Sequence, residues 1–357
     1  MAKKEEKLLK LSAIDPYIED NIVKPTEKEI RGFDWISFGE KNDYPAYLLG
    51  LYKNVPTLQS IINGCKDYTV GDDVVCSIAS LNPSEETIST MLEKIALDYW
   101  IHGAFAINVI RNRAGNVAAI YYLNVANVRS NKEGTMFYYS EEWDKSAGRV
   151  KFVSYPAFSK NSTETNSILY VKNAHNSIYG LPVYAAAVKG AEIMQSVDEY
   201  HLNAINNGFM ASYIVSLNNG QPSQEIQQEI EDELNEKFSG YQNAGRIMVT
   251  FNKSKETETT VQKLESENVG EKYNTLVSWS ERQLFTSFRA NPNLFGIATE
   301  GTGFAGEEYE NTFKLFNRTM IRPAQRLICD TFARIYGVDV LTIKPFSMEG
   351  DVEKNVE

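Results

Sequence analysis

Two long helical segments, at 184–208 and at about 270–290, most constrain how this chain can fold, because a small polar module separates them. The first begins near Pro182, a residue favoured in the first turn of a helix, and stops at Asn207-Gly208. Apolar residues mark one side of the second helix: Tyr273, Leu276, Val277, Leu284, Phe285 and Phe288. The chain is therefore predicted to carry an insert on two long helices.

The insert is predicted to be strand, helix, strand. FMASYIVSL and NAGRIMVTF have the apolar, β-branched composition of strands, and QPSQEIQQEIEDELNEKF lies between them. Apolar residues recur at every fourth position of that helix, at Ile226, Ile230, Leu234 and Phe238. Only a narrow stripe of it can be buried, so its acidic surface is either solvated or part of a contact between subunits. NKSKETETTVQKLESEN, which follows, is polar enough for a surface loop with one short strand.

Residues 1–179 are predicted to form one α+β unit. An amphipathic helix is expected from Ser84, with Ile88, Met91, Leu92, Ile95 and Tyr99 on one face. GAFAINVIR and VAAIYYLN then read as two strands joined by NRAGN, which supplies the turn residues of a hairpin. TMFYYS is a third strand, and VKFVSY is a short one within the polar segment 141–178.

The last helix is predicted at about 307–336 and contains Pro323. Proline has no N–H to donate to the carbonyl of Thr319, and its ring collides with the preceding turn. The sequence therefore predicts a kink or break near Ile321 to Arg322.

GTGFAG, at 301–306, matches the glycine fingerprint of dinucleotide-binding folds but lacks the context of one. That fingerprint needs a buried strand before it and an acidic residue about 20 residues later, at the end of a second strand. Here a proline-containing segment precedes it, and a long helix occupies the later position. Glu307, Glu308 and Glu310 also fill the first turn of the following helix, where a phosphate would meet their charge. The residues favour a flexible loop between two helices, and no cofactor is expected.

Composition excludes several classes of protein. The chain has three cysteines, none in a C-x-x-C pair, and three histidines, which argues against a disulfide framework and against a zinc site. Runs of acidic residues on a helix are more often a solvated surface than a metal site. A net charge of −11 opposes tight binding along a DNA duplex.

No signal peptide or membrane span is visible, so the chain is expected to be made and kept in a cytosol. Without a P-loop, a nucleophile elbow or a histidine pair, no catalytic residue is predicted, and the chain is not expected to be an enzyme. The four tryptophans are expected in a core or an interface, and His102, His175 and His201 at solvent or at helix caps.

Taken in order, the segments resemble the portal protein, or head-tail connector, of tailed double-stranded DNA bacteriophages. The resemblance covers roughly residues 38–336. It rests on DYWIHGAFAINVIRNRAGNVAAIYYLNVANV, SIYGLPVYAAA, NNGFMAS, GYQNAGRIMV, NPNLFGI and EYENTFKLFNRTMIRPAQRL, in this order. Any one of these is weak alone, whereas six in the right order are specific.

The resemblance implies the α+β portal fold, in which an α+β wing carries long stem helices, a clip and a tunnel loop. Applied to this chain, its segments are an N-terminal arm at 1–37, the wing at 38–183, stem helices at 184–208 and 269–291, the clip at 209–268, the tunnel loop at 292–306, a long kinked helix returning to the wing at 307–340, and a short C-terminal tail at 341–357. The crown that some portals carry is expected to be short or absent.

The resemblance also implies the functional residues. The tunnel loop in the DNA channel would contain Glu300, Gly301, Thr302, Gly303, Phe304 and Gly306. Its glycines would allow it to deform, and Phe304 would project into the channel or onto a neighbouring loop. Docking of terminase or adaptor to the clip would involve Glu225, Glu229, Glu233 and Glu236. Arg282 and Arg289 are candidates for the family's basic residues near the channel.

The implied partners are further copies of the chain in a homo-oligomeric ring, expected to be a dodecamer, together with terminase, a head-tail adaptor and the major capsid protein. Contact with double-stranded DNA would be transient and non-specific, since a channel must let the duplex slide. The ring would lie in the virion, at the portal vertex of a capsid assembled in the cytoplasm of a bacterial host. Two alternatives stay open: a head or adaptor protein of the virion without a channel, and a soluble nucleotide-binding enzyme that uses GTGFAG.

Overall fold

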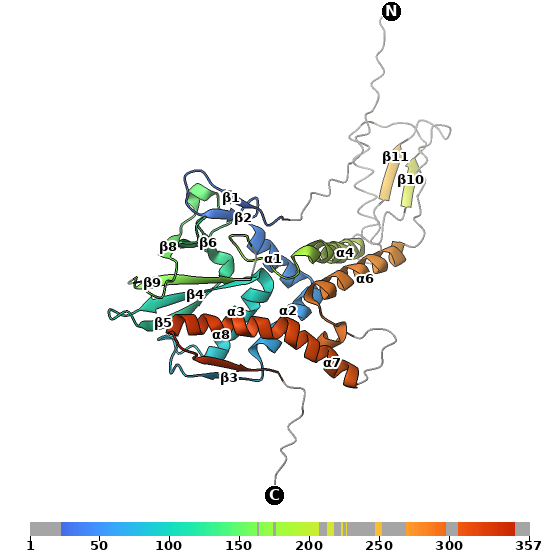
Figure 1. Cartoon of the computed structure of the whole chain (residues 1–357). Coiled ribbons are helices and arrows are strands. Elements are labelled where there is room, and N and C mark those ends of the chain that lie inside the picture. The colour runs from blue at the N-terminus through green and yellow to red at the C-terminus, as the bar shows by residue number, and fades with distance from the viewer. Residues whose placement is uncertain are drawn as a thin grey trace, which may run out of the picture. The chain divides into compact units, whose positions relative to one another are not determined.

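A computed structural model of the chain describes residues 23–162, 164–173, 176–206, 213–217, 223, 226, 247–251, 269–297 and 306–346. Within these ranges the protein combines helices with short strands (Figure 1). It divides into two compact units. The first unit holds the described residues of 1–49, 78–181 and 334–336, and the second holds the described remainder. Residues 50–77 therefore belong with the second unit, although the sequence predicts 1–179 as one unit.

The first unit is built on an antiparallel hairpin, as predicted. Strand β4 (Ala104–Arg111) pairs with β5 (Val117–Leu123) on one side and with β9 (Asn166–Lys172) on the other. The turn is organised by Asn112, whose side-chain oxygen accepts hydrogen bonds from the backbone N–H groups of Ala114 and Asn116. Because this turn is local in sequence, NRAGN was sufficient to predict it.

A second sheet completes this unit. Strands β6 (Val128–Ser130), β7 (Met136–Tyr139) and β8 (Val153–Pro156) pair in sequence order, and the last two match the strands predicted from TMFYYS and VKFVSY. The short hairpin β1 (Glu27–Glu29) and β2 (Ile36–Phe38) precedes them, and the 3₁₀ turns Val125–Asn127 and Ala147–Arg149 join the later elements. Trp35 and Trp143 meet edge to face at 4.8 Å in the core, and the Arg129 guanidinium lies 5.0 Å from the Trp143 ring.

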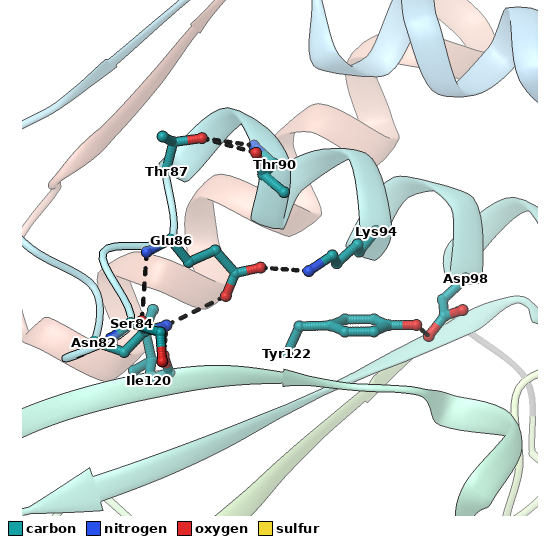
Figure 2. Close-up of polar contacts among 9 residues, drawn as sticks. All are labelled: Asn82, Ser84, Glu86, Thr87, Thr90, Lys94, Asp98, Ile120 and Tyr122. Atoms are coloured by element: carbon teal, nitrogen blue, oxygen red, sulfur yellow. Dashed lines mark hydrogen bonds and ion pairs between the residues drawn. The ribbon is translucent and has the colours of Figure 1, made fainter.

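Helix α3 (Ile88–His102) begins later than the sequence predicts. Its N-cap is Thr87, which accepts a hydrogen bond from the Thr90 N–H, and not Ser84. Figure 2 shows the cause: the Asn82 side chain donates to the Ile120 carbonyl of β5 and accepts from the N–H groups of Ser84 and Glu86. These bonds fix a turn that includes a left-handed residue, Glu85 with φ 55°, so a helix cannot start before it.

The second unit contains elements that the sequence did not reveal. Helix α1 (Tyr44–Asn54) crosses from the first unit into the second, and α2 (Pro56–Val70) follows with proline in its first turn. Strand β3 (Asp73–Cys76) then pairs antiparallel with β12 (Leu341–Lys344), near the C-terminus. The segment 341–357 is thus more than a tail, because its first residues complete a two-stranded sheet.

Two long helices follow, as predicted. The 3₁₀ turn Ala185–Ala187 leads into α4 (Val188–Asn206), and α6 (Val269–Phe288) lies beside it (Figure 1). Between them in sequence, strands β10 (Tyr213–Leu217) and β11 (Ile247–Phe251) form a parallel pair. Parallel pairing requires a crossover connection, which agrees with a strand-helix-strand module. The predicted acidic helix lies outside the described residues except at 223 and 226.

The final helix is divided. A 3₁₀ turn (Pro292–Phe295) precedes 298–305, and α7 (Gly306–Phe316) continues through a π-helical segment (Asn317–Ile321) into α8 (Arg322–Tyr336). The Arg322 N–H bonds to the Asn317 carbonyl, five residues back, directly before Pro323. A π turn inserted where proline cannot donate explains the change in helix type. None of the described helices is long and apolar enough to cross a membrane.

Candidate functional site

Most of the residues predicted to form the site fall outside the described part of the chain. This holds for Glu300, Gly301, Thr302, Gly303 and Phe304 of the predicted tunnel loop, and for Glu225, Glu229, Glu233 and Glu236 of the predicted clip. Gly306 begins α7, and Pro323 lies in the first turn of α8. The roles of these residues, and a kink at Pro323, stay predictions.

Both described ends of the predicted tunnel loop meet at Tyr68 of α2. Its ring contacts Phe295, at the start of the loop, at 6.2 Å, and Phe313 and Phe316, after the loop, at 5.5 and 6.0 Å. The Tyr68 hydroxyl donates to the Leu294 carbonyl at 2.8 Å, and burial raises the pKa of Tyr68 to about 12. The tyrosine therefore stays protonated and holds the start of the loop, while its ring packs against the helix that follows.

The C-terminal strand contributes to the same cluster. Phe346, just beyond β12, lies 5.3 Å from the Tyr68 ring and 5.9 Å from Phe313. The side-chain amide of Gln325 on α8 donates to the carbonyls of Tyr68 and Thr69. The sequence did not predict this cluster, because its members come from four separate segments.

Helices α4 and α6, the predicted stem, pack closely and antiparallel. Gly190 faces Ser280, where an added β-carbon would lie 3.3 Å from the Ser280 carbonyl oxygen, and Tyr200 lies 5.1 Å from Tyr273. One end of the pair is anchored by Phe288, whose buried ring stacks on Tyr184 at 5.5 Å. The small residue at 190 permits the backbones to approach, and the aromatic rings fix the register.

The rest of the pair exposes large apolar side chains at more than one level. Tyr200 is 45% exposed and Leu202 59% on α4, while Leu276 is 42% and Trp279 48% exposed on α6. A cavity of about 280 Å³ opens beside Trp279, lined also by Ala186, Ala187 and Arg282. Exposed large apolar side chains of this kind are candidates for an interaction surface. Trp35, Trp100 and Trp143, by contrast, are buried, as expected of core tryptophans.

The titratable side chains do not form a catalytic arrangement in the described ranges. Burial raises the pKa of Cys65 well above its usual value and also raises that of Cys329, which disfavours the reactive thiolates. His102 is buried in α3, contrary to the expectation of a solvent or capping position, and burial lowers its pKa to about 3. His201 is exposed between Tyr200 and Tyr273. No cluster of three or more metal-binding side chains occurs among the residues that the structure describes.

Asp98 is another buried ionisable group of the first unit. One of its oxygens, Oδ2, accepts a hydrogen bond from the Tyr122 hydroxyl at 2.9 Å (Figure 2). The same oxygen accepts from the Val125 N–H, also at 2.9 Å. Burial raises the pKa of Asp98 to about 7, and the two hydrogen bonds oppose that rise. The carboxyl joins α3 to the hairpin and to the turn after it, which makes it a structural group.

Comparison with known proteins identifies the family. The sequence matches the phage portal protein family over residues 77–345. No curated protein matches it. Among solved structures it is similar to a chain of the virion of a native gene transfer agent particle, with a TM-score of 0.53 and 15% identity over 88% of this chain and 85% of that one.

Two further structures are similar. A chain from the neck of the native particle, computed with C12 symmetry, has a TM-score of 0.52 and 15% identity, with 85% of each chain covered. The HK97 family phage portal protein of Corynebacterium diphtheriae has a TM-score of 0.49 and 10% identity, with 83% of this chain and 93% of that one covered. At such identities the two gene transfer agent structures show the fold, and the family match extends over most of the chain. This chain therefore belongs to the phage portal protein family.

Proposed function

We propose that this chain is the subunit of a ring at one vertex of a phage-type capsid, whose central channel carries double-stranded DNA during packaging and ejection. The observation that carries the proposal is the stem pair, α4 and α6, with its exposed Tyr200, Leu202, Leu276 and Trp279. Closure of a ring by head-to-tail contacts covers different patches on each subunit, which accounts for apolar surface on more than one face.

A ring of twelve subunits fits the comparisons. One similar chain comes from a particle neck computed with C12 symmetry, and another from a whole virion. We assign this chain by analogy to the portal vertex of the virion, where it would contact further copies of itself and the major capsid protein. The segment containing β10 and β11 would be the clip that receives terminase and a head-tail adaptor.

The charge of the chain suits a channel for sliding DNA. Tight duplex binding relies on many lysines and arginines, whereas this chain has a net charge of −11. A repulsive wall keeps the duplex mobile, and the glycine-rich loop at 301–306 would deform around it. A separate ATPase would supply the energy for movement. The chain itself would act as a structural component.

Negative-stain electron microscopy of the purified full-length protein tests the proposal. Rings with a central hole are expected, together with a mass by light scattering that is a multiple of 40.3 kDa. A uniform monomer across micromolar concentrations would favour the alternative of an adaptor or other head protein without a channel.

A further inference from the structure

Two exposed patches on the stem helices each combine an apolar feature with a charge, and the two charges are opposite. The first, the socket, is the mainly apolar cavity beside Trp279, which is lined also by Ala186, Ala187, Arg282, Gln283, Thr286 and Ser287. The second, the knob, is the exposed pair Asp198 and Leu202 on α4. Residues four apart share a helix face, so this carboxylate and this apolar side chain point in the same direction. The socket therefore offers an apolar hollow and a cation, and the knob an apolar side chain and an anion.

Both charged groups lack a side-chain partner within the described part of the subunit. Neither the Arg282 guanidinium nor the Asp198 carboxylate forms an ion pair or a side-chain hydrogen bond with any residue that the structure describes. The neighbouring Glu199 is different, because it accepts a hydrogen bond from Gln195. Arg282 and Asp198 are thus available to a partner molecule.

The two patches lie at different heights along the stem. Position 190 faces Ser280, next to Trp279, whereas Tyr200, beside the knob, faces Tyr273. Ten residues of helix correspond to about 15 Å, so the knob cannot reach the socket of its own subunit. A contact between them must join unlike patches of two molecules, which makes it a head-to-tail contact. Such a contact closes a ring if the stems are inclined to the ring axis, so that the two patches of neighbouring subunits lie at one level.

We propose that the socket receives Leu202 of the neighbouring subunit, with Asp198 of that subunit paired to Arg282. The inference rests on the ring proposed above and assigns part of its contact to specific residues. DNA fits this place less well, because a phosphate could meet Arg282 but would leave the apolar hollow beside Trp279 unfilled. A side chain that brings both an apolar group and a carboxylate satisfies the whole patch.

Tryptophan fluorescence tests the socket directly. Three of the four tryptophans are 1–6% exposed, and Trp279 is 48% exposed. Emission that is quenched by iodide in the dissociated subunit therefore comes from Trp279. Assembly into rings is expected to shift that emission to shorter wavelength and to protect it from iodide, and W279F is expected to lose the quenchable component.

A charge exchange tests the pair. R282E and D198K should each raise the subunit concentration needed for half-assembly about tenfold, and the double variant D198K/R282E should recover most of that loss. R326E is the matched control, since Arg326 is also exposed on a helix of the second unit and undergoes the same change in charge. It should assemble as the natural chain does. Circular dichroism checks that each variant is folded.

The outcomes separate this inference from the proposed function. If the natural chain forms no ring, both fail. If rings form while Trp279 stays open to iodide, or if the double variant is no better than the single ones, the function stands and this contact is wrong. Protection of Trp279 only after duplex DNA is added would assign the patch to the channel wall and would also overturn the contact between subunits.

Discussion

A β-carbon added to Gly64 would lie 2.6 Å from Cδ1 of Phe295, because the phenylalanine ring packs directly on the backbone of α2. Gly64 is therefore part of the support that Tyr68 and its neighbours give to the start of the predicted tunnel loop. G64A is expected to lower the free energy of unfolding by about 1–3 kcal/mol, since the ring must move to admit a methyl group. Urea denaturation of the purified variant measures the change.

Gly50 provides a matched control. It also lies inside a helix, α1, but an added β-carbon there would meet no atom within 4 Å. G50A is therefore expected to raise the free energy of unfolding by about 0.5–1 kcal/mol, through the better helix propensity of alanine. Equal effects of the two substitutions would show that the ring of Phe295 does not occupy the place described.

Nucleotide binding by GTGFAG can be tested without mutation. A ligand that binds only the native state at 100 times its dissociation constant adds about 2.7 kcal/mol of stability. We expect ATP, GTP, NAD and FAD at millimolar concentration to leave the melting temperature unchanged, because acidic residues follow the glycines. A rise of several degrees that depends on ligand concentration, and that a G303V variant loses, would restore the enzyme alternative.

The sequence predicted the elements whose signals are local. The β4–β5 hairpin follows from its turn residues, and helices α4 and α6 follow from their length and periodicity. Helices α1 and α2 were missed because Gly50, Pro56 and Gly64 interrupt the helical pattern there. The structure explains two of these residues: Pro56 lies in the first turn of α2, and the absence of a side chain at Gly64 leaves room for the ring of Phe295.

The site was less predictable, because its contacts join distant segments. Tyr68 bonds to a carbonyl 226 residues away, and no local pattern marks such a pair. Trp279 was expected in a core or an interface, but its periodicity alone does not distinguish the buried face of α6 from the exposed one. That distinction depends on which side of α6 packs against Gly190 and the rest of α4.

Asp98 is expected to make stability depend on pH. Its folded pKa of about 7 lies above the ordinary value near 4, so between these values the folded protein holds a proton that the unfolded chain releases. This contribution is fully present below about pH 4 and is lost as the pH rises to 7. D98N should therefore gain stability relative to the natural chain as the pH increases from 4 to 7, by up to about 1.4 kcal/mol per pH unit. Urea denaturation across this range measures the difference.

The substitution is well matched to its surroundings. Both hydrogen bonds to Asp98 end on Oδ2, so the amide oxygen of asparagine can accept them both. Y122F is the complementary variant: it removes a bond that lowers the pKa of Asp98 and should shift the pH window upward. A difference between D98N and the natural chain that stays constant from pH 4 to 7 would contradict the assignment.

His102 is expected to change the pH dependence of stability in the direction opposite to Asp98. Burial, reinforced by the charge of Arg129, lowers its folded pKa to about 3, so between pH 3 and 6.5 the unfolded chain binds a proton that the folded protein does not. Stability from this group is present above pH 6.5 and is lost as the pH falls. In the natural chain it offsets the slope from Asp98, and H102Q should therefore expose a steeper decline with rising pH. No difference in slope between H102Q and the natural chain would show that the imidazole is not held neutral.

Arg289 ends α6 in a conformation that favours glycine. Its φ is 51°, its N–H bonds to the Thr286 carbonyl, and the next N–H, of Ala290, bonds to the Phe285 carbonyl, so it occupies the left-handed position of a Schellman motif. A residue with a β-carbon pays about 1 kcal/mol there. R289G should raise the free energy of unfolding by about 0.5–1 kcal/mol, whereas R289A, which removes the same charge but keeps the β-carbon, should bring no gain. Chemical denaturation of the two variants separates the effect of backbone strain from the effect of charge. If R289G is no more stable than R289A, the left-handed backbone at this position carries no cost.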